Sequence, residues 1–181
     1  MLLGFKGLDA HDDDYETLQV YSAIMGGGLS SRLFQEIREK RGLVYNISSS
    51  KISFKDTGVF FVKAGTGENK IKELFPVLCD ELIKSPQNIT EEEIARAKAQ
   101  LKFNLVKSME FSMVNADICA HDLIKYNRLV EIEEKIEKIN NVSKESIERV
   151  VTRLLQSKPT IASIGPIKNL EKLEKIQSRF N

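Results

Sequence analysis

A short stretch between residues 25 and 45 constrains the fold more than any other part of the chain. It reads Met-Gly-Gly-Gly-Leu-Ser-Ser-Arg-Leu-Phe-Gln-Glu-Ile-Arg-Glu-Lys-Arg-Gly-Leu-Val-Tyr. The three glycines are expected to end one helix, and Ser30 or Ser31 to cap a second. Gly42 then turns the chain into a strand. Arg38 and Tyr45 therefore lie seven residues apart across a helix-to-strand corner.

The hydrophobic pattern around this corner predicts an α+β fold. Short runs of alternating or continuous apolar residues predict strands, and apolar residues at a spacing of three to four predict helices. Strands are expected at 2–8, 43–53, 59–64 and 159–165. Helices are expected at 15–25, at 31–37, at 71–83 with Pro86 ending it, at 94–109 after a Thr90–Glu93 capping box, at 114–126, at 129–139, at 144–155 after a Ser143 cap, and as a short surface helix within 167–180.

The order of these elements favours an antiparallel or mixed sheet with helices packed on one face. The strands at 43–53 and 59–64 are joined by a short Asp56-Thr-Gly turn, which predicts a hairpin and argues against a doubly wound parallel sheet. A chain of 181 residues is expected to form one domain, 1–181. Because a strand is predicted from the first residues with no lead-in, we expect the sequence to be a fragment of a longer protein.

Composition gives no indication of a nucleic acid or membrane partner. The chain has 27 basic and 26 acidic residues and a net charge of +1. No apolar segment approaches the roughly 20 residues of a membrane span. Cys79 and Cys119 lie in apolar helical patterns, which favours buried thiols in a reducing compartment over a disulfide or metal site. We expect a cytoplasmic, bacterial protein, or one of the mitochondrial matrix if the source is eukaryotic.

The usual catalytic motifs are absent from the sequence. His11 and His121 are its two histidines, and neither belongs to an H-E-x-x-H or an H-x-x-E-H motif. His11 precedes three aspartates, for which an exposed acidic helix start is favoured over a metal site. His121 lies two residues from Cys119, and side chains at that spacing on a helix point to different sides. The sequence therefore predicts no metal ligands and no nucleophile.

Arg38 and Tyr45 allow two interpretations. In the first, the arginine is solvated and the tyrosine only packs against the sheet. In the second, the guanidinium and the phenol lie at one edge of a cavity and donate hydrogen bonds to a peptide carbonyl or a developing oxyanion. Composition alone does not favour the second interpretation.

The corner resembles the signature of the second, non-catalytic half of the M16 (pitrilysin and mitochondrial processing peptidase-like) zinc peptidases. The resemblance lies in the glycines at 26–28, in Ser-Ser-Arg-Leu-Phe at 30–34, and in Arg38, Glu39, Lys40, Gly42, Leu43 and Tyr45. It implies a LuxS-like α+β half that lacks its first strand and its zinc-bearing N-terminal domain. It also implies that zinc, held by H-x-x-E-H and a distal glutamate, belongs to that missing half, and that this chain binds no metal.

The resemblance assigns substrate binding and transition-state stabilisation to Arg38 and Tyr45. Gly26, Gly27 and Gly28 are a candidate cleft loop, at the position of a longer substrate-contacting loop in processing-peptidase α subunits. Because this run is short, that loop's role is not assigned to it. No residue of the chain is expected to be catalytic by itself.

Three functions follow as hypotheses. In the first, the chain is the substrate-holding C-terminal half of a zinc metallopeptidase, inactive alone, with a peptide substrate and a zinc-bearing half in the same polypeptide or a separate subunit. In the second, it is a catalytically dead relative that serves as a structural or assembly subunit. In the third, it is a stand-alone peptide-binding module. A homodimer through a surface left uncovered is also expected of the isolated chain.

Overall fold

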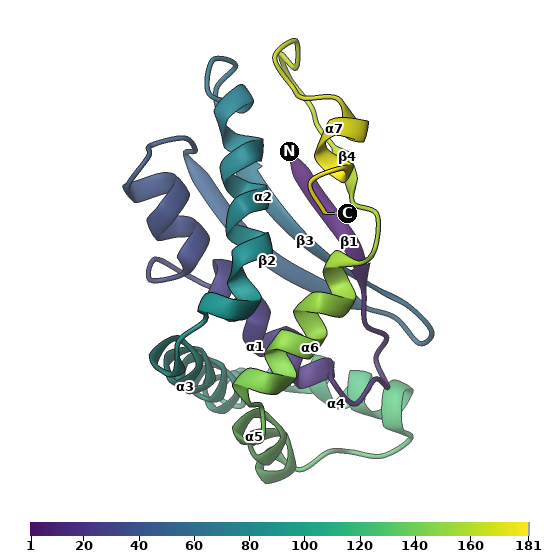
Figure 1. Cartoon of the computed structure of the whole chain (residues 1–181). Helices are drawn as coiled ribbons and strands as arrows, with labels where there is room; N and C mark the ends of the chain where they lie inside the picture. The colour runs from purple at the N-terminus through teal and green to yellow at the C-terminus, as the bar shows by residue number, and fades with distance from the viewer. Residues whose placement is uncertain (181) are drawn as a thin grey trace.

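The structure, a computed structural model, describes residues 1–180 as an antiparallel sheet with helices on one face (Figure 1). The four strands, in the order β2-β3-β1-β4, are β1 (Leu2–Gly7), β2 (Asn46–Ser53), β3 (Gly58–Gly65) and β4 (Thr160–Ala162). The helices are α1 (Tyr15–Gly26), the π-helix η1 (Phe34–Glu39), α2 (Ile71–Asn88), α3 (Glu91–Ser108), α4 (Ser112–Tyr126), α5 (Ile132–Asn140), α6 (Lys144–Leu155) and α7 (Leu173–Gln177). The predicted α+β class and the β2–β3 hairpin are confirmed.

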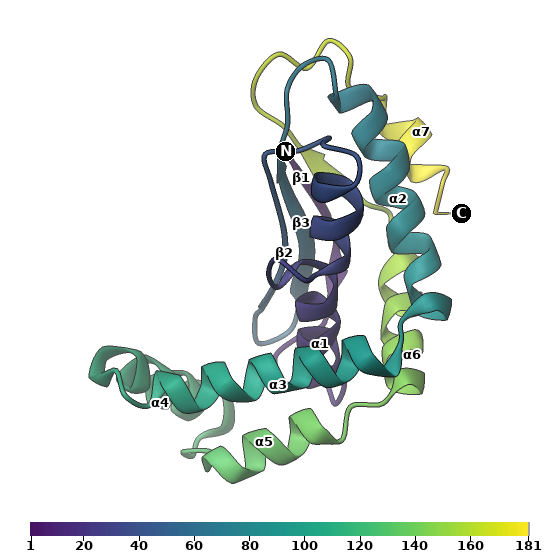
Figure 2. The same ribbon diagram turned by 90° about the vertical axis from the view of Figure 1, so that its left-hand side faces the viewer.

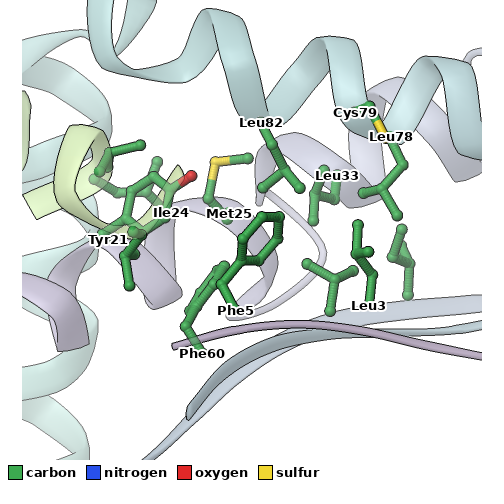
Figure 3. Close-up of a cluster of buried hydrophobic side chains, with 14 of the residues drawn as sticks. Leu3, Phe5, Tyr21, Ile24, Met25, Leu33, Phe60, Leu78, Cys79 and Leu82 are labelled. Atoms are coloured by element: carbon green, nitrogen blue, oxygen red, sulfur yellow. The ribbon is translucent and has the colours of Figure 1, made fainter. Parts of the chain in front are cut away.

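The core lies between the sheet and the helices on its covered face. Figure 2 shows the sheet nearly edge-on, with α1, α2 and α6 all on one side of it. Phe5 and Phe60 point from β1 and β3 toward Met25 of α1 and Leu82 of α2, and all four side chains are buried (Figure 3). Burial of these large apolar side chains is the main force that holds the helical layer on the sheet.

The opposite face of the sheet is uncovered. Opposed residues on neighbouring strands share a face, as Leu2 and Lys63, or Ile52 and Val59, do. Part of this face is a shallow hollow of about 670 Å³. The hollow is lined mainly by apolar side chains, among them Leu2, Phe61, Ile52, Val59 and Ala162. Exposed apolar area of this kind is commonly buried against another surface.

Helices α3 and α4 extend past the end of the sheet, on the side of its uncovered face (Figure 2). Helix α4 carries exposed apolar side chains: Met113, Val114, Leu123 and Ile124. No helix within residues 1–180 is both long enough and apolar enough to span a membrane.

The corner differs from its prediction in three ways. The segment after the glycines is a π-helix, and no side chain caps its start. Ser31 instead donates its hydroxyl back to the Gly28 carbonyl at 2.6 Å. Strand β2 begins at Asn46 and not at residue 43, because the Leu43 amide is still bonded to the Ile37 carbonyl of η1. The capping box at Thr90–Glu93 and the Ser143 cap are confirmed, and the structure adds that Ser143 forms a capping box with Ser146.

Pro86 does not end α2, which continues to Asn88. A proline lacks the N–H that would bond the carbonyl four residues earlier, here that of Leu82. Ser85 supplies the missing donor, because its hydroxyl lies 2.8 Å from that carbonyl. The Tyr21 hydroxyl lies 2.9 Å from the Ser85 hydroxyl, and both residues are buried. This network allows the helix to pass through the proline, a device that the proline rule by itself does not predict.

A second cluster joins α4 to the sheet. The ammonium groups of Lys51 on β2 and Lys125 on α4 lie 3.2 Å and 3.5 Å from the ring centroid of Tyr15 on α1. Such contacts attract an ammonium to the negative face of the ring. Burial, followed by the charge of Lys125, lowers the pKa of Lys51 to about 7, although Glu16 acts in the opposite direction. The cluster therefore holds a lysine that releases its proton near neutral pH.

We predict that Ser85→Ala lowers the free energy of unfolding by about 1–3 kcal/mol, because the buried Leu82 carbonyl loses its donor. Urea unfolding followed by circular dichroism measures this. Tyr21→Phe is the comparison, since it keeps the bond from Ser85 to Leu82 and should cost less. Equal stability of Ser85→Ala and the unaltered protein would show that the proline is tolerated for another reason.

We predict that stability rises with pH above about 7, in part through Lys51. Between pH 7 and the ordinary lysine pKa of 10.5, the unfolded chain binds a proton at Lys51 that the folded chain does not, so folding is favoured as pH rises. Lys51→Met should reduce this rise and stabilise the protein most at pH 6.5. The measurement is urea unfolding at pH 6.5 and 9.5, with Lys55→Met in the exposed β2–β3 turn as control. A pH dependence that Lys51→Met leaves unaltered would contradict the prediction.

Candidate functional site

The helix-to-strand corner is built from backbone hydrogen bonds. The Lys40 amide bonds the Gln35 carbonyl five residues back at 3.0 Å, which is the wide π turn. Gly42 has φ of +59°, and its amide closes the helix on the Arg38 carbonyl at 2.9 Å. A residue with a side chain is strained in this left-handed conformation, so the glycine fixes where the helix stops.

Residues from β3 and from the turn before α2 hold the far side of the corner. The Tyr45 amide donates to the Gly65 carbonyl at 2.8 Å. The Thr66 hydroxyl donates to the Leu43 carbonyl at 2.6 Å, and the Lys70 ammonium donates to the Gly42 carbonyl. The entry to β2 is thus bonded on successive residues and has a defined path.

Tyr45 places its side chain on the surface of this braced segment. It is 74% exposed, whereas Leu43 and Val44 just before it are buried. A Cβ added to Gly67 would lie 3.4 Å from the Tyr45 hydroxyl, so the phenol extends over a glycine that leaves it room. Asn46, Gly65 and Gly67 line a neighbouring surface cavity of about 310 Å³. A phenol in this position can donate a hydrogen bond to a bound molecule.

Three arginines lie in the corner stretch, and the structure separates them. Arg32 is committed to Glu93 through two hydrogen bonds of 2.6 and 2.8 Å and also donates to the Asn88 carbonyl. Burial by itself would raise the pKa of the Glu93 carboxyl, but the hydrogen bonds from Arg32 and Thr90 and the charge of Arg32 together lower this pKa below its usual range. This ion pair is largely buried and ties the start of η1 to α3. Arg32 is therefore structural.

Arg41 also has a hydrogen-bond partner within the domain, whereas the Arg38 side chain has none among residues 1–180. Arg41 donates to the Glu36 carbonyl at 2.7 Å and to the Glu36 carboxylate at 3.0 Å. Arg38 makes neither a side-chain hydrogen bond nor an ion pair with any of residues 1–180. Its guanidinium carbon instead lies 4.5 Å from the ring centroid of Phe34. All of its N–H donors thus remain available to a ligand.

The structure brings Arg38 and Tyr45 to the same corner, one at the end of η1 and the other at the entry to β2. Each side chain rests on a different support, Phe34 for the arginine and the Gly67 backbone for the tyrosine. That they bind one substrate together stays a prediction. Sequence reasoning missed Phe34, Thr66 and Lys70 as supports of this corner. The spacing of Phe34 four residues before Arg38 was the available signal for the first of them.

The three glycines before the corner have different surroundings. A Cβ on Gly26 would lie 2.0 Å from the Ser49 amide nitrogen, so this glycine allows α1 to touch β2. The Gly27 carbonyl accepts a hydrogen bond from Gln100 at 2.8 Å. Gly28 is exposed and lines a cavity of about 260 Å³ together with Leu29 and residues of α3. The cleft-loop role of these glycines stays a prediction, and Gly26 has a packing role in any event.

No set of side chains suited to zinc is found in the part of the chain that the structure describes. Residues 1–180 contain no group of three or more His, Cys, Asp or Glu placed to hold a metal ion. His11 packs edge-on against Tyr126, and His121 bonds the Asp117 carbonyl. Burial raises the pKa of the Cys79 thiol to about 12, so this thiol is not a nucleophile near neutral pH. The residues that the structure describes therefore offer no site for zinc, which the resemblance assigns to the other half.

Comparison with known proteins gives a consistent result. Residues 1–101 match the family model described as the peptidase M16 inactive domain. An uncharacterized zinc protease of Rickettsia felis is 35% identical over 168 residues, which are 92% of this chain and 40% of that protein. The mitochondrial-processing peptidase subunit alpha of Caenorhabditis elegans is 27% identical over 187 residues, covering 97% of this chain and 36% of the subunit.

A solved structure shares the fold across the chain. A chain of complex III2 from Candida albicans superposes with a TM-score of 0.87 at 20% identity, over 99% of this chain and 45% of that one. The sequence thus spans less than half the length of each of these three proteins.

Proposed function

The chain belongs to the M16 peptidase family, as an inactive domain of its zinc protease-like proteins, and from this premise we propose that it is the substrate-holding half of such a peptidase. Its partner is a zinc-bearing half, in the same polypeptide or in a separate subunit. Its ligand is a peptide, and the partner half supplies the metal.

The uncommitted guanidinium of Arg38 is the observation that carries this proposal. The neighbouring Arg32 and Arg41 have found carboxylate partners within the domain, whereas Arg38 keeps all its donors free. A guanidinium fork matches a peptide carbonyl or an oxyanion, and the exposed Tyr45 phenol adds a further donor at the same corner. Both groups are neutral or positive donors, as a developing negative charge requires.

The proposed role is binding and charge stabilisation at the peptide backbone. An extended peptide presents carbonyl oxygens that lack partners once they leave water. Arg38 and Tyr45 would satisfy such oxygens, and would bind more tightly to an oxygen on which negative charge develops. The corner has a fixed backbone, so the positions from which these two side chains extend are set before the peptide arrives.

A structural or assembly subunit is the second candidate, and one observation favours it. The uncovered sheet face and the exposed side of α4 present apolar area of the kind that subunit interfaces bury. The fold is also that of a chain of complex III2. A zinc motif H-x-x-E-H, encoded upstream of residue 1 or in a neighbouring gene, would favour the peptidase, and its absence the assembly role.

We predict that the purified chain alone shows no zinc-dependent peptidase activity, because residues 1–180 hold no set of ligands for the metal. The measurement is cleavage of a fluorogenic peptide library with added zinc. The same assay with the zinc-bearing half present is the positive control. Robust cleavage by the chain alone that a chelator abolishes would overturn the assignment.

We predict that Arg38→Ala and Tyr45→Phe each slow turnover by about 10-fold to 1000-fold when the zinc-bearing half is present, the range for lost oxyanion donors. Steady-state kinetics on one peptide gives kcat and KM for each variant. Arg41→Ala is the matched control, since it removes the same charge from the same corner and should retain activity. Unaltered kinetics for both Arg38→Ala and Tyr45→Phe would remove the pair from the site.

A further inference from the structure

The ring of Phe34 is the structural support of the Arg38 side chain. The guanidinium carbon lies over the ring at 4.5 Å from its centroid, and the two residues are four positions apart in η1. We propose that Phe34 is a positioning residue, which holds the Arg38 fork in the orientation that binds the peptide backbone. This inference rests on the proposed function of Arg38.

Stacking orients a guanidinium without using its hydrogen-bond donors. In a stacked pair, the flat face of a guanidinium meets the ring and its N–H bonds point outward in the plane of the group. A carboxylate partner would fix the arginine equally well, but it would occupy the donors, as Glu93 does for Arg32. An aromatic support is therefore the arrangement suited to an arginine that must be both ordered and free to bind.

The ring is itself held by the core. Phe34 is half-buried and packs against the main hydrophobic cluster. Leu33 before it and Ile37 after it are fully buried, which fixes that side of η1 against the domain. The core thus holds the Phe34 ring in place, and the ring in turn orders the Arg38 guanidinium. An arginine without this support would sample many rotamers, and binding would have to remove that freedom.

The π winding of η1 places the two side chains together. Hydrogen bonding to the fifth residue back, as from Lys40 to Gln35, gives a wider turn than an α-helix has. The helix η1 ends at Glu39, and the Gly42 amide bonds the Arg38 carbonyl, so the arginine is on the last turn before the corner. Single π turns of this kind are found often at functional sites.

The test uses Phe34→Leu, which keeps an apolar side chain but removes the ring, and Phe34→Tyr, which keeps the ring. With the zinc-bearing half present, Phe34→Leu should lower kcat/KM by about 2-fold to 5-fold, the effect of one exposed cation–π contact. Phe34→Tyr should retain the original value. In an Arg38→Ala background, Phe34→Leu should have no further effect, because there is no guanidinium left to position.

A second readout on the chain alone separates the two proposals. In proton NMR, the Arg38 side-chain protons should be shifted upfield by the ring in the unaltered protein and in Phe34→Tyr, and should lose that shift in Phe34→Leu. Circular dichroism confirms that each variant is folded, and Phe34→Met replaces Phe34→Leu if the leucine variant is not.

The outcomes are distinct. A ring-current shift with kinetics that Arg38→Ala leaves unaltered would overturn the proposed function of Arg38 while the stack itself stands. The positioning role would be overturned if Arg38→Ala lowered kcat/KM while Phe34→Leu left it unaltered. It would also be overturned if the Arg38 protons of the unaltered protein showed no ring-current shift. An equal loss for Phe34→Leu with and without Arg38 would show that the ring supports the fold and not the arginine.

Discussion

The close approach of α1 to β2 at Gly26 is the contact on which the placement of the candidate site depends. A single added Cβ would overlap the Ser49 backbone, at 2.0 Å from its nitrogen. The Ser49 hydroxyl also bonds the Ser22 carbonyl of α1 at 2.7 Å, so helix and strand are joined directly. The chain thus leaves α1 already at β2 and must return to the start of the same strand. The segment between α1 and β2 contains η1 and Gly42. The contact of Gly26 with Ser49 therefore fixes the two elements that this segment joins.

Much of the fold could be predicted because it follows from local patterns. The capping boxes at Thr90 and Ser143 require only residues close in sequence, and the β2–β3 hairpin only a short turn between two apolar runs. The errors arose where distant residues change a local rule. Pro86 ends an isolated helix, but the buried Ser85 hydroxyl satisfies the carbonyl that the proline leaves free. The start of β2 is delayed because the Leu43 amide still bonds the Ile37 carbonyl of η1.

The candidate site shows the same division. The sequence pattern singled out Arg38 and Tyr45 by resemblance, and the structure adds why Arg38 differs from its neighbours. Arg32 is paired with a glutamate that lies 61 residues further along the chain. No local pattern contains that partner, so the three arginines of the stretch could not be ranked from their spacing. The Phe34–Arg38 contact is local, and its spacing of four residues could have indicated it. The π turn that carries it could not be predicted, because sequence periodicity does not distinguish a π turn from an α turn.

On β2 and β3, the uncovered face of the sheet is polar at one end and apolar at the other. Near the entry to β2, where Tyr45 lies, its side chains include Asn46, Ser48 and Lys63. Toward the β2–β3 turn they include Ile52 and Val59, and α4 extends past the sheet at that same end (Figures 1 and 2). Apolar area is stabilised by burial against another surface, whereas the polar end is stable in water. The part of the face that gains most from a partner is thus distant from the corner, so covering it leaves the free donors of Arg38 and Tyr45 in contact with solvent and accessible to a peptide.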